Sequence, residues 1–389
     1  MSDLFRQSVK EQPPPPARPR PSPINPIFED VEESSNPPSD SSSSSADSAA
    51  SVNTLRPNSR EQSAPEHHWT NYFAQELWLE QEIDTHTAKY HVYVTPPTDP
   101  KKGPLFICHH GAGASGLSFA VFARSLRQRL PNAGVLSLEA RAHGSAITSS
   151  TTGEENADFS IATLAADALL MIDLTKEKLG WSSLPPTVLI GHSLGGAIVT
   201  DLAANFALGP ALIGFCVLDV VEGSALEALG HMKTYLASRP SVFSSLAEAV
   251  NWHTQSRTIR DYESAAVSVP SLLVPSPGGS GKIIWRTNLS ATSPYWSDWF
   301  TSMSSKFLSG RGAKMLILAG TDRLDRELMI GQMQGKFQLV VLPEAGHFVQ
   351  EDVPAKTADL LVEFFKRNDR SAMVLPPKVS DLLAQGKRV

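Results

Sequence analysis

The chain has 389 residues, and its 34 lysines and arginines against 40 aspartates and glutamates give a formal net charge of −6. This balance, without a basic run longer than a triplet, argues against a nucleic-acid partner. The 2 cysteines lie inside apolar runs, which excludes a disulfide framework and is typical of a reducing compartment. Because the sequence shows no signal-peptide core and no apolar run of membrane-spanning length, we expect a cytoplasmic or nuclear protein without a membrane segment.

Residues 1–66 contain 12 of the 29 prolines, a serine run at 41–45 and few large apolar side chains. Such a segment buries too little apolar surface to offset its conformational entropy, so we predict that it is disordered. The proline-rich stretch at 13–23 favours polyproline II and is a candidate ligand for an SH3 or WW domain. The alternative is a solvated tail without a partner.

Ordered structure is expected to begin near Trp69. Residues 76–83 and 90–94 alternate apolar and polar side chains as half-buried strands do, and residues 105–108 form a short apolar strand. The sequence HHGAGA follows this third strand at 109–114. Glycines at this place allow a backbone N–H to approach an oxyanion closely. A plain turn between a strand and a helix is the alternative.

The stretch VLIGHSLGGA at 188–197 carries the most specific motif. An apolar strand at 187–190 and a helix at 197–208 are predicted on either side of the pattern G-x-S-x-G. This pattern is typical of a nucleophile elbow, a sharp strand-to-helix turn that exposes the serine Oγ. Ser193 is therefore the predicted nucleophile, and an ordinary glycine-rich turn is the alternative.

Helices are also predicted at 119–130 and 162–179, and a strand at 134–138 ends in the polar turn EARAHG. His143 in this turn precedes Ser193 in the chain. Hydrolases with this elbow place their triad in the order serine, acid, histidine. We therefore interpret His143 as a structural loop histidine and not as the base.

Residues 212–220 predict another buried strand, with Asp219 at its carboxyl end. In an open parallel sheet, ligands and catalytic groups gather at this edge. Residues 223–308 lose the alternation of strands and helices, so we predict a cap or lid over the site. Four tryptophans in this segment suit an apolar or peptide ligand, and packing within the cap explains them equally well.

The alternation resumes with strands at 314–318 and 337–342 and a closing helix at 358–367. Asp322 follows the first of these strands, and His347 lies in the turn PEAGHF after the second. A histidine after the last strand is the expected general base of an α/β-hydrolase, and a surface histidine is the alternative. Residues 371–389 are predicted to be a loosely attached tail.

These elements predict an α/β-hydrolase fold, with a mostly parallel central sheet flanked by helices. Residues 67–222 and 309–370 would form its core, and residues 223–308 the inserted cap. Two carboxylates qualify as the triad acid. The pattern alone slightly favours Asp322 over Asp219, because the acid most often follows the penultimate strand.

Residues 69–367 resemble the protein phosphatase methylesterases, which remove the methyl ester from the C-terminal leucine of the type 2A phosphatase catalytic subunit. The motifs CHHGAG at 108–113 and GHSLGGA at 191–197 are shared with the whole superfamily. The stretches DVVEG at 219–223 and GQMQGKFQ at 331–338 are specific to this family. The chain departs from the animal members, since it lacks their long acidic insertion in the cap.

The resemblance implies Ser193 as nucleophile, Asp219 as acid and His347 as base, which leaves Asp322 a structural role. It also implies no metal or organic cofactor, and the type 2A phosphatase catalytic subunit with a methylated C-terminus as partner.

For the oxyanion hole, the resemblance implies the backbone N–H groups of Ala112 and Leu194. As side chains that line the substrate channel we expect Trp285, Arg286, Tyr295 and Trp299. Two other functions stay open from the sequence: a small-molecule carboxylesterase or lipase, and a mainly non-catalytic protein that binds inactive phosphatase.

Overall fold

The computed structural model describes residues 67–83, 85–279, 281–320 and 324–369. The predictions for the tails at 1–66 and 371–389, and for Asp322, lie outside these residues.

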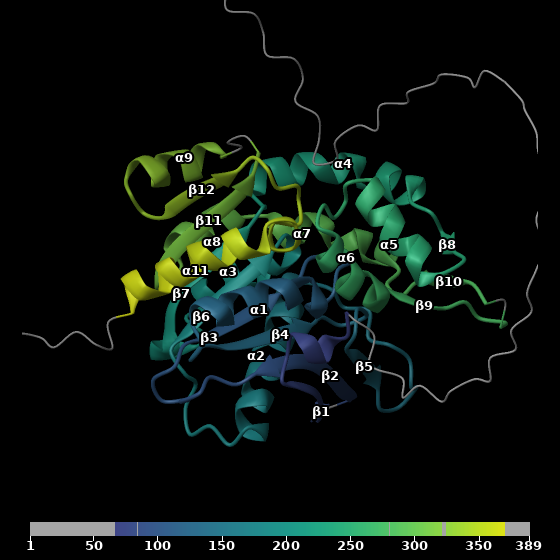
Figure 1. Cartoon of the computed structure of the whole chain (residues 1–389), viewed down its shortest axis with the longest axis horizontal. Helices are drawn as coiled ribbons and strands as arrows, with labels where there is room; N and C mark the ends of the chain where they lie inside the picture. Colours follow the sequence, from purple (N-terminus) through teal and green to yellow (C-terminus); the bar gives the residue numbers. More distant parts are fainter. Residues whose placement is uncertain (1–66, 84, 280, 321–323, 370–389) are drawn as a thin grey trace, which may run out of the picture. The chain divides into compact units, whose positions relative to one another are not determined.

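A nine-stranded sheet organises the described part of the chain, in the order β1-β2-β4-β3-β6-β7-β11-β12, with β5 paired to β2 (Figure 1). The pairs of β2 with β1, β4 and β5 are antiparallel, and every pair from β4 to β12 is parallel. The strands are β1 (Gln75–Ile83), β2 (His86–Thr95), β3 (Leu105–His109), β4 (Gly134–Glu139), β5 (Ala146–Ser149), β6 (Thr187–His192), β7 (Leu212–Leu218), β11 (Ala313–Ala319) and β12 (Gln338–Leu342).

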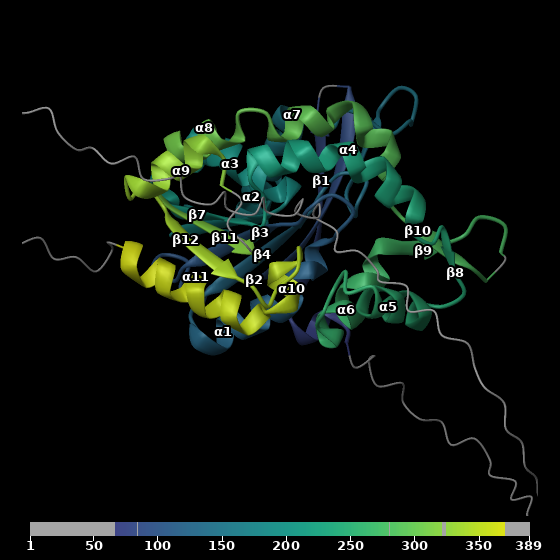
Figure 2. The same ribbon diagram turned by 90° about the horizontal axis from the view of Figure 1, so that it is seen from above.

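Helices cover both faces of this sheet, as Figure 2 shows. On one face lie α1 (Ala120–Arg129), α10 (Val349–Asp352) and α11 (Pro354–Asn368), and on the other α2 (Ile161–Lys178), α3 (Leu194–Ala204), α8 (Met303–Ser309) and α9 (Arg326–Met333). The central strands are therefore apolar at consecutive positions: Phe106 and Cys108 pack in one core cluster, while Ile107 between them packs in the other. The predicted fold class is confirmed.

Several predicted boundaries were wrong. The closing helix was expected at 358–367 but α11 begins at Pro354, and the strand expected at 90–94 is part of β2, which begins at His86. The helix after the elbow was expected at residues 197–208, but α3 begins at Leu194 and ends at Ala204. Ser193 is the residue that directly precedes the first helical turn, so the helix includes Leu194, Gly195 and Gly196. It ends earlier because Phe206 adopts a φ of 51°, which an α-helix does not allow.

Between β7 and β11 the chain adds a run of further elements, from α4 (Glu222–Ser238) to α8. Of these, α4, α7 (Trp296–Phe300) and α8 pack into the same core cluster as α2 and α3. A small three-stranded sheet in this run was not predicted; all its pairs are antiparallel, and it joins β8 (Val242–Phe243), β10 (Ile283–Trp285) and β9 (Leu273–Pro275). With α5 (Leu246–Gln255) and α6 (Tyr262–Ser268) it encloses an apolar cluster around Phe243 and Ile259. We call the segment 223–308 the cap. No helix among the described residues combines the length and apolarity needed to cross a bilayer.

A buried ion pair ties the sheet to α2. Arg141 donates from Nε and Nη2 to the two carboxylate oxygens of Asp167, at 2.6 and 3.0 Å, and Tyr90 Oη donates to the same carboxylate at 2.7 Å. The Arg141 and Asp167 side chains are only 5% and 8% exposed. Removing one partner of such a pair leaves an uncompensated buried charge.

We therefore expect Asp167→Asn to lower the free energy of unfolding by about 3–5 kcal/mol, as measured by urea denaturation. The matched control is Asp173→Asn, two turns along the same helix, where Asp173 pairs with Lys176 near the surface. The control should change stability by less than about 1 kcal/mol. Equal effects of the two substitutions would contradict the structural role of the buried pair.

Candidate active site

Three side chains predicted to act together follow the carboxyl ends of strands in the parallel half of the sheet. Ser193 follows β6, Asp219 follows β7, and His347 lies in the turn between β12 and α10. Because these strands are parallel, their carboxyl ends meet at one edge of the sheet.

Ser193 occupies a strained backbone conformation, with φ 51° and ψ −120°. A positive φ at a residue other than glycine costs on the order of 1–3 kcal/mol, and this conformation persists only where the surrounding structure imposes it. Here the strand β6 must turn at once into α3, so the serine lies at the apex of the turn. Its side chain is half-buried, which leaves part of it open to solvent.

Two glycines make this turn possible. A Cβ placed on Gly191 would lie 2.1 Å from the carbonyl oxygen of Gly195, and a Cβ on Gly195 would lie 2.1 Å from the carbonyl oxygen of His109. Both distances are far below van der Waals contact, so only glycine fits at either position. The elbow therefore packs backbone against backbone, both across itself and against the end of β3.

Asp219 is the carboxylate that contacts the candidate base. Its Oδ2 accepts a hydrogen bond of 2.8 Å from His347 Nδ1, and its Oδ1 accepts one of 2.8 Å from the backbone N–H of Ala319. Asp219 has a φ of 50° and is 4% exposed. The second bond orients the carboxylate, because it engages the oxygen that faces away from the imidazole.

The hydrogen bond to Asp219 determines the tautomer of His347. A carboxylate accepts and cannot donate, so Nδ1 carries the proton and Nε2 has the free lone pair that a general base requires. The backbone carbonyl of His347 accepts a 2.8 Å bond from His192 Nε2, and the two rings lie 4.6 Å apart. His192 precedes Ser193, so this contact joins the histidine turn to the elbow.

No hydrogen bond joins Ser193 Oγ to His347 among the described residues. The hydrogen bond between Asp219 and His347 is thus formed, while one between Ser193 and His347 is not, among the residues that the structure describes. Hydrogen bonds of this kind are often long in unliganded hydrolases and tighten when a substrate binds.

The predicted oxyanion donors border the same serine. Leu194 is the first residue of α3, so its N–H has no partner within the helix. Among the described residues, no acceptor takes the N–H of Ala112 either. The loop that carries Ala112 lies against the elbow, since a Cβ on Gly111 would be 3.0 Å from the Cβ of Ser193.

The turn that carries His347, residues 343–348, is bound by two residues that the sequence did not single out, Asp352 at the end of α10 and Arg260 in the cap. The Asp352 carboxylate accepts from the backbone N–H of Gly346 at 2.6 Å and of Arg260 at 2.7 Å. Arg260 also donates from Nη1 to the carbonyl of Glu344 at 2.7 Å. The cap residue is separated from both partners by more than 80 positions, so no local pattern reveals these bonds.

The four predicted channel residues make their contacts in different parts of the molecule. Trp285 donates from Nε1 to the carbonyl of Pro240 and packs inside the cap cluster. Trp299 is 4% exposed and donates to the carbonyl of Phe159.

The other two channel candidates differ in exposure. The Tyr295 ring contacts Phe159 and is partly buried, whereas Arg286 is exposed and donates from Nε to the carbonyl of Ser271. Arg286 is therefore the most exposed of the four.

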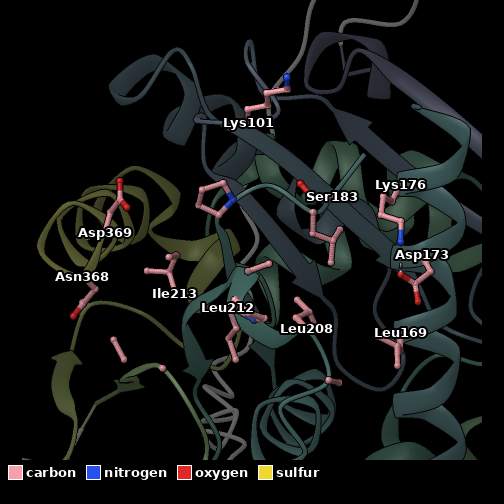
Figure 3. A pocket seen from close by; sticks show the side chains of 17 residues that line it. Lys101, Leu169, Asp173, Lys176, Ser183, Leu208, Leu212, Ile213, Asn368 and Asp369 are labelled. Carbon is pink, nitrogen blue, oxygen red and sulfur yellow. Dashed lines mark hydrogen bonds and ion pairs between the residues drawn. The ribbon is translucent and has the colours of Figure 1, made fainter. Parts of the chain in front are cut away.

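A depression of about 1100 Å³ lies at the other edge of the sheet (Figure 3). Its lining includes Pro186, Leu212 and Ala313, which lie at the amino ends of β6, β7 and β11. The side chains of Lys101, Asp173 and Asn368 also border it. Because Ser193 and Asp219 follow the carboxyl ends of the same strands, this depression is not part of the candidate active site.

Residues 106–360 match the sequence family described as "Alpha/beta hydrolase family". The protein phosphatase methylesterase 1 of Aspergillus oryzae is 58% identical over 321 residues, which cover 81% of this chain and 75% of that protein. The protein of the same name from Aspergillus fumigatus is 58% identical over 320 residues, which cover 81% and 76%.

Among solved structures, the E-2-(acetamidomethylene)succinate hydrolase is similar to this chain with a TM-score of 0.56 and 17% identity. The similarity covers 75% of this chain and 100% of the hydrolase. At this identity it concerns the fold alone.

The His192 ring leads to a prediction on pH. The side chain is buried, and this burial lowers its pKa to about 3. An unfolded chain binds that proton near pH 6.5, so stability falls as the pH drops below about 6.5 and continues to fall toward pH 3. The stability advantage of the wild type over His192→Gln should therefore shrink by up to about 1.4 kcal/mol per pH unit below pH 6.5.

The measurement is urea denaturation of both proteins at pH 7, 6 and 5. His231→Gln is the control, because His231 lies on α4 and its side chain is exposed. A constant difference between wild type and His192→Gln across this range would show that His192 is protonated in the folded protein.

Proposed function

The chain belongs to the protein phosphatase methylesterase family and is a carboxylic-ester hydrolase, and from this premise we propose that it demethylates the C-terminal leucine of the type 2A phosphatase catalytic subunit. We infer a phosphatase as the substrate because two relatives that are 58% identical to this chain are named protein phosphatase methylesterase 1. The observation that carries the chemistry is the 2.8 Å bond between Asp219 and His347 beside the strained Ser193 turn.

In the proposed reaction, Ser193 Oγ attacks the carbonyl carbon of the methyl ester while His347 Nε2 takes the serine proton. The negative charge moves to the carbonyl oxygen, which would accept from the N–H groups of Ala112 and Leu194. Donors placed in advance for such a charge are worth about 3–4 kcal/mol each in the transition state. Collapse of the intermediate breaks the bond to the methoxy group, which takes the proton from His347 and leaves as methanol.

Water completes the cycle. His347 takes a proton from the water as it attacks the acyl-enzyme, and Ser193 leaves with that proton restored, which releases a free carboxylate. Asp219 stays ionised throughout, because its part is to orient the ring and stabilise the imidazolium that forms twice per turnover. This chemistry uses no metal or organic cofactor.

We assign the ester chemistry to the core, residues 67–222 and 309–370, and partner contacts to the cap, residues 223–308. Arg286, exposed beside β10, and the more buried Trp285, Tyr295 and Trp299 are the proposed channel residues. The stretch 13–23 remains a candidate SH3 or WW ligand. A cytoplasmic or nuclear location accords with the two buried free thiols, Cys108 and Cys216.

Mass spectrometry of the phosphatase C-terminus tests the reaction. Incubation of the methylated phosphatase with wild-type protein should remove one methyl group, and Ser193→Ala should lower this rate by at least about 10⁴-fold because the nucleophile is lost. A p-nitrophenyl ester, tested in parallel, separates the candidates. Turnover of that ester without demethylation of the phosphatase would favour a small-molecule esterase, and stable phosphatase binding without either activity would favour a binding protein.

The acid is tested by Asp219→Asn and Asp322→Asn under the same conditions. We expect Asp219→Asn to lower kcat by about 10⁴-fold, because the neutral amide allows the wrong imidazole tautomer. Asp322→Asn should keep kcat within about threefold of the wild type. A collapse of kcat in Asp322→Asn alone would transfer the role of acid to Asp322.

A further inference from the structure

His143 lies in the turn at 140–145, which follows β4, but its ring reaches the neighbouring loop at 109–114, which follows β3. The backbone N–H of Gly113 donates to His143 Nε2 at 2.9 Å. The other ring nitrogen, Nδ1, lies 2.8 Å from the carbonyl oxygen of Arg141. A carbonyl only accepts, so Nδ1 carries the proton and Nε2 must be the acceptor.

A second histidine makes the reciprocal connection. His110, in the loop, accepts the backbone N–H of Ala140 on Nε2 at 3.0 Å and donates from Nδ1 to the carbonyl of Gly111 at 2.8 Å. The two rings lie 5.1 Å apart. Each segment thus places one imidazole on a backbone N–H of the other, and we call His110 and His143 the histidine clasp.

Both rings have to be neutral for the clasp to hold, since a protonated Nε2 donates and cannot accept. His143 is 5% exposed and His110 1% exposed. Burial lowers the pKa of His143 to about 4 and that of His110 well below its ordinary value. The clasp is therefore intact at neutral pH.

The cap contacts the clasp at two points. Thr287, just after β10, donates from Oγ1 to the carbonyl of Ala142 at 2.9 Å. Ala142 has a φ of 57°, so the turn that aims the His143 ring is strained. On the other side, Leu289 covers Gly113, because its Cδ1 is 2.7 Å from the position that a Cβ on that glycine would take.

Gly113 follows Ala112, whose N–H is one of the two proposed oxyanion donors. Fixing the N–H of Gly113 fixes the orientation of the peptide plane that Ala112 and Gly113 share. This removes one of the rotations by which the loop could turn the Ala112 N–H away from the oxyanion. A donor misplaced by about 1 Å loses much of its effect on the transition state.

We propose that His143 is a positioning residue for the oxyanion hole, which orients the loop through Gly113, and that Thr287 couples the cap to it. The inference rests on the proposed role of Ser193 and of the Ala112 N–H. His143 touches neither substrate nor nucleophile, and its effect on the reaction passes through the loop.

Kinetics on a p-nitrophenyl ester tests this without any dependence on phosphatase recognition. His143→Leu should lower kcat by about 10–100-fold, short of the loss for a whole oxyanion donor, with KM within about threefold. His143→Gln keeps an acceptor near the Nε2 position and should restore kcat to above about one third of the wild type. A purely structural role predicts instead that the kcat of each variant falls in proportion to its own loss of stability, whether or not the new side chain can accept a hydrogen bond.

Thr287→Val removes only the hydroxyl and should lower kcat by about 3–10-fold. Combined with His143→Leu, it should add no further loss, because the contact acts through the same residue. Thr254→Val is the matched control, since Thr254 also lies in the cap but its hydroxyl donates to carbonyls of its own helix. The control should match the wild type.

Three outcomes overturn the inference: wild-type kcat in His143→Leu, no recovery in His143→Gln, or equal kcat in Thr287→Val and Thr254→Val. Should His143→Leu fail to fold, His143→Gln and Thr287→Val still test the inference. We expect the kcat of His143→Gln to stay above about one third of the wild type, and that of Thr287→Val to fall below about one third. Ser193→Ala in the same assay separates the two proposals. Full activity of Ser193→Ala would refute the role of Ser193 as nucleophile. Loss of activity in Ser193→Ala, together with a wild-type kcat in His143→Leu, would refute only the positioning role of His143.

Discussion

The close approach of backbone to backbone at the elbow is the constraint on which the rest of the structure depends. Gly191 and Gly195 leave no room for a Cβ, and the second of them also lies against the end of β3. This contact allows Ser193 to adopt a positive φ and still be followed at once by α3. The backbone strain is confined to Ser193. The free energy that offsets it comes from the apolar cores on both faces of the sheet, in which β6 and α3 are packed.

Polar groups at the carboxyl edge pose a second problem, since the loops there bring unpaired backbone N–H and C=O groups into the interior. Neutral imidazoles solve it. His110 and His143 each accept a hydrogen bond from a backbone N–H of another loop, and His192 donates to the backbone carbonyl of His347. A neutral imidazole offers one donor and one acceptor on opposite sides of a rigid ring, so it joins two segments at a fixed distance. The edge is thus held rigid by side chains that do not themselves take part in the proposed chemistry.

The acid of the triad illustrates how far sequence patterns reach. Both Asp219 and Asp322 follow a strand of the parallel sheet, so their positions left two candidates for the triad acid. Position slightly favoured Asp322, because the acid most often follows the penultimate strand. Resemblance to the family selected Asp219, and the structure places the Asp219 carboxylate 2.8 Å from His347. No pattern predicted the hydrogen bond from the Arg260 N–H to the Asp352 carboxylate, because the two residues are 92 positions apart. The small sheet of the cap was not predicted either, because β8, β9 and β10 have at most three residues each. The four channel candidates were chosen for residue type, and burial separated them: Trp299 packs inside, while Arg286 stays exposed.

The sequence by itself determined the hydrolase fold, the elbow with Ser193 and the place of His347, because each depends on local features: apolar periodicity, paired glycines and a turn after a strand. Only the tertiary structure decided which partners those residues meet. The tautomer of His347 follows from Asp219, 128 positions away, and the part of His143 follows from Gly113 on the neighbouring strand's loop. Hydrogen bonds act over about 3 Å, and such distances between segments remote in the chain exist only after the sheet has brought their ends together.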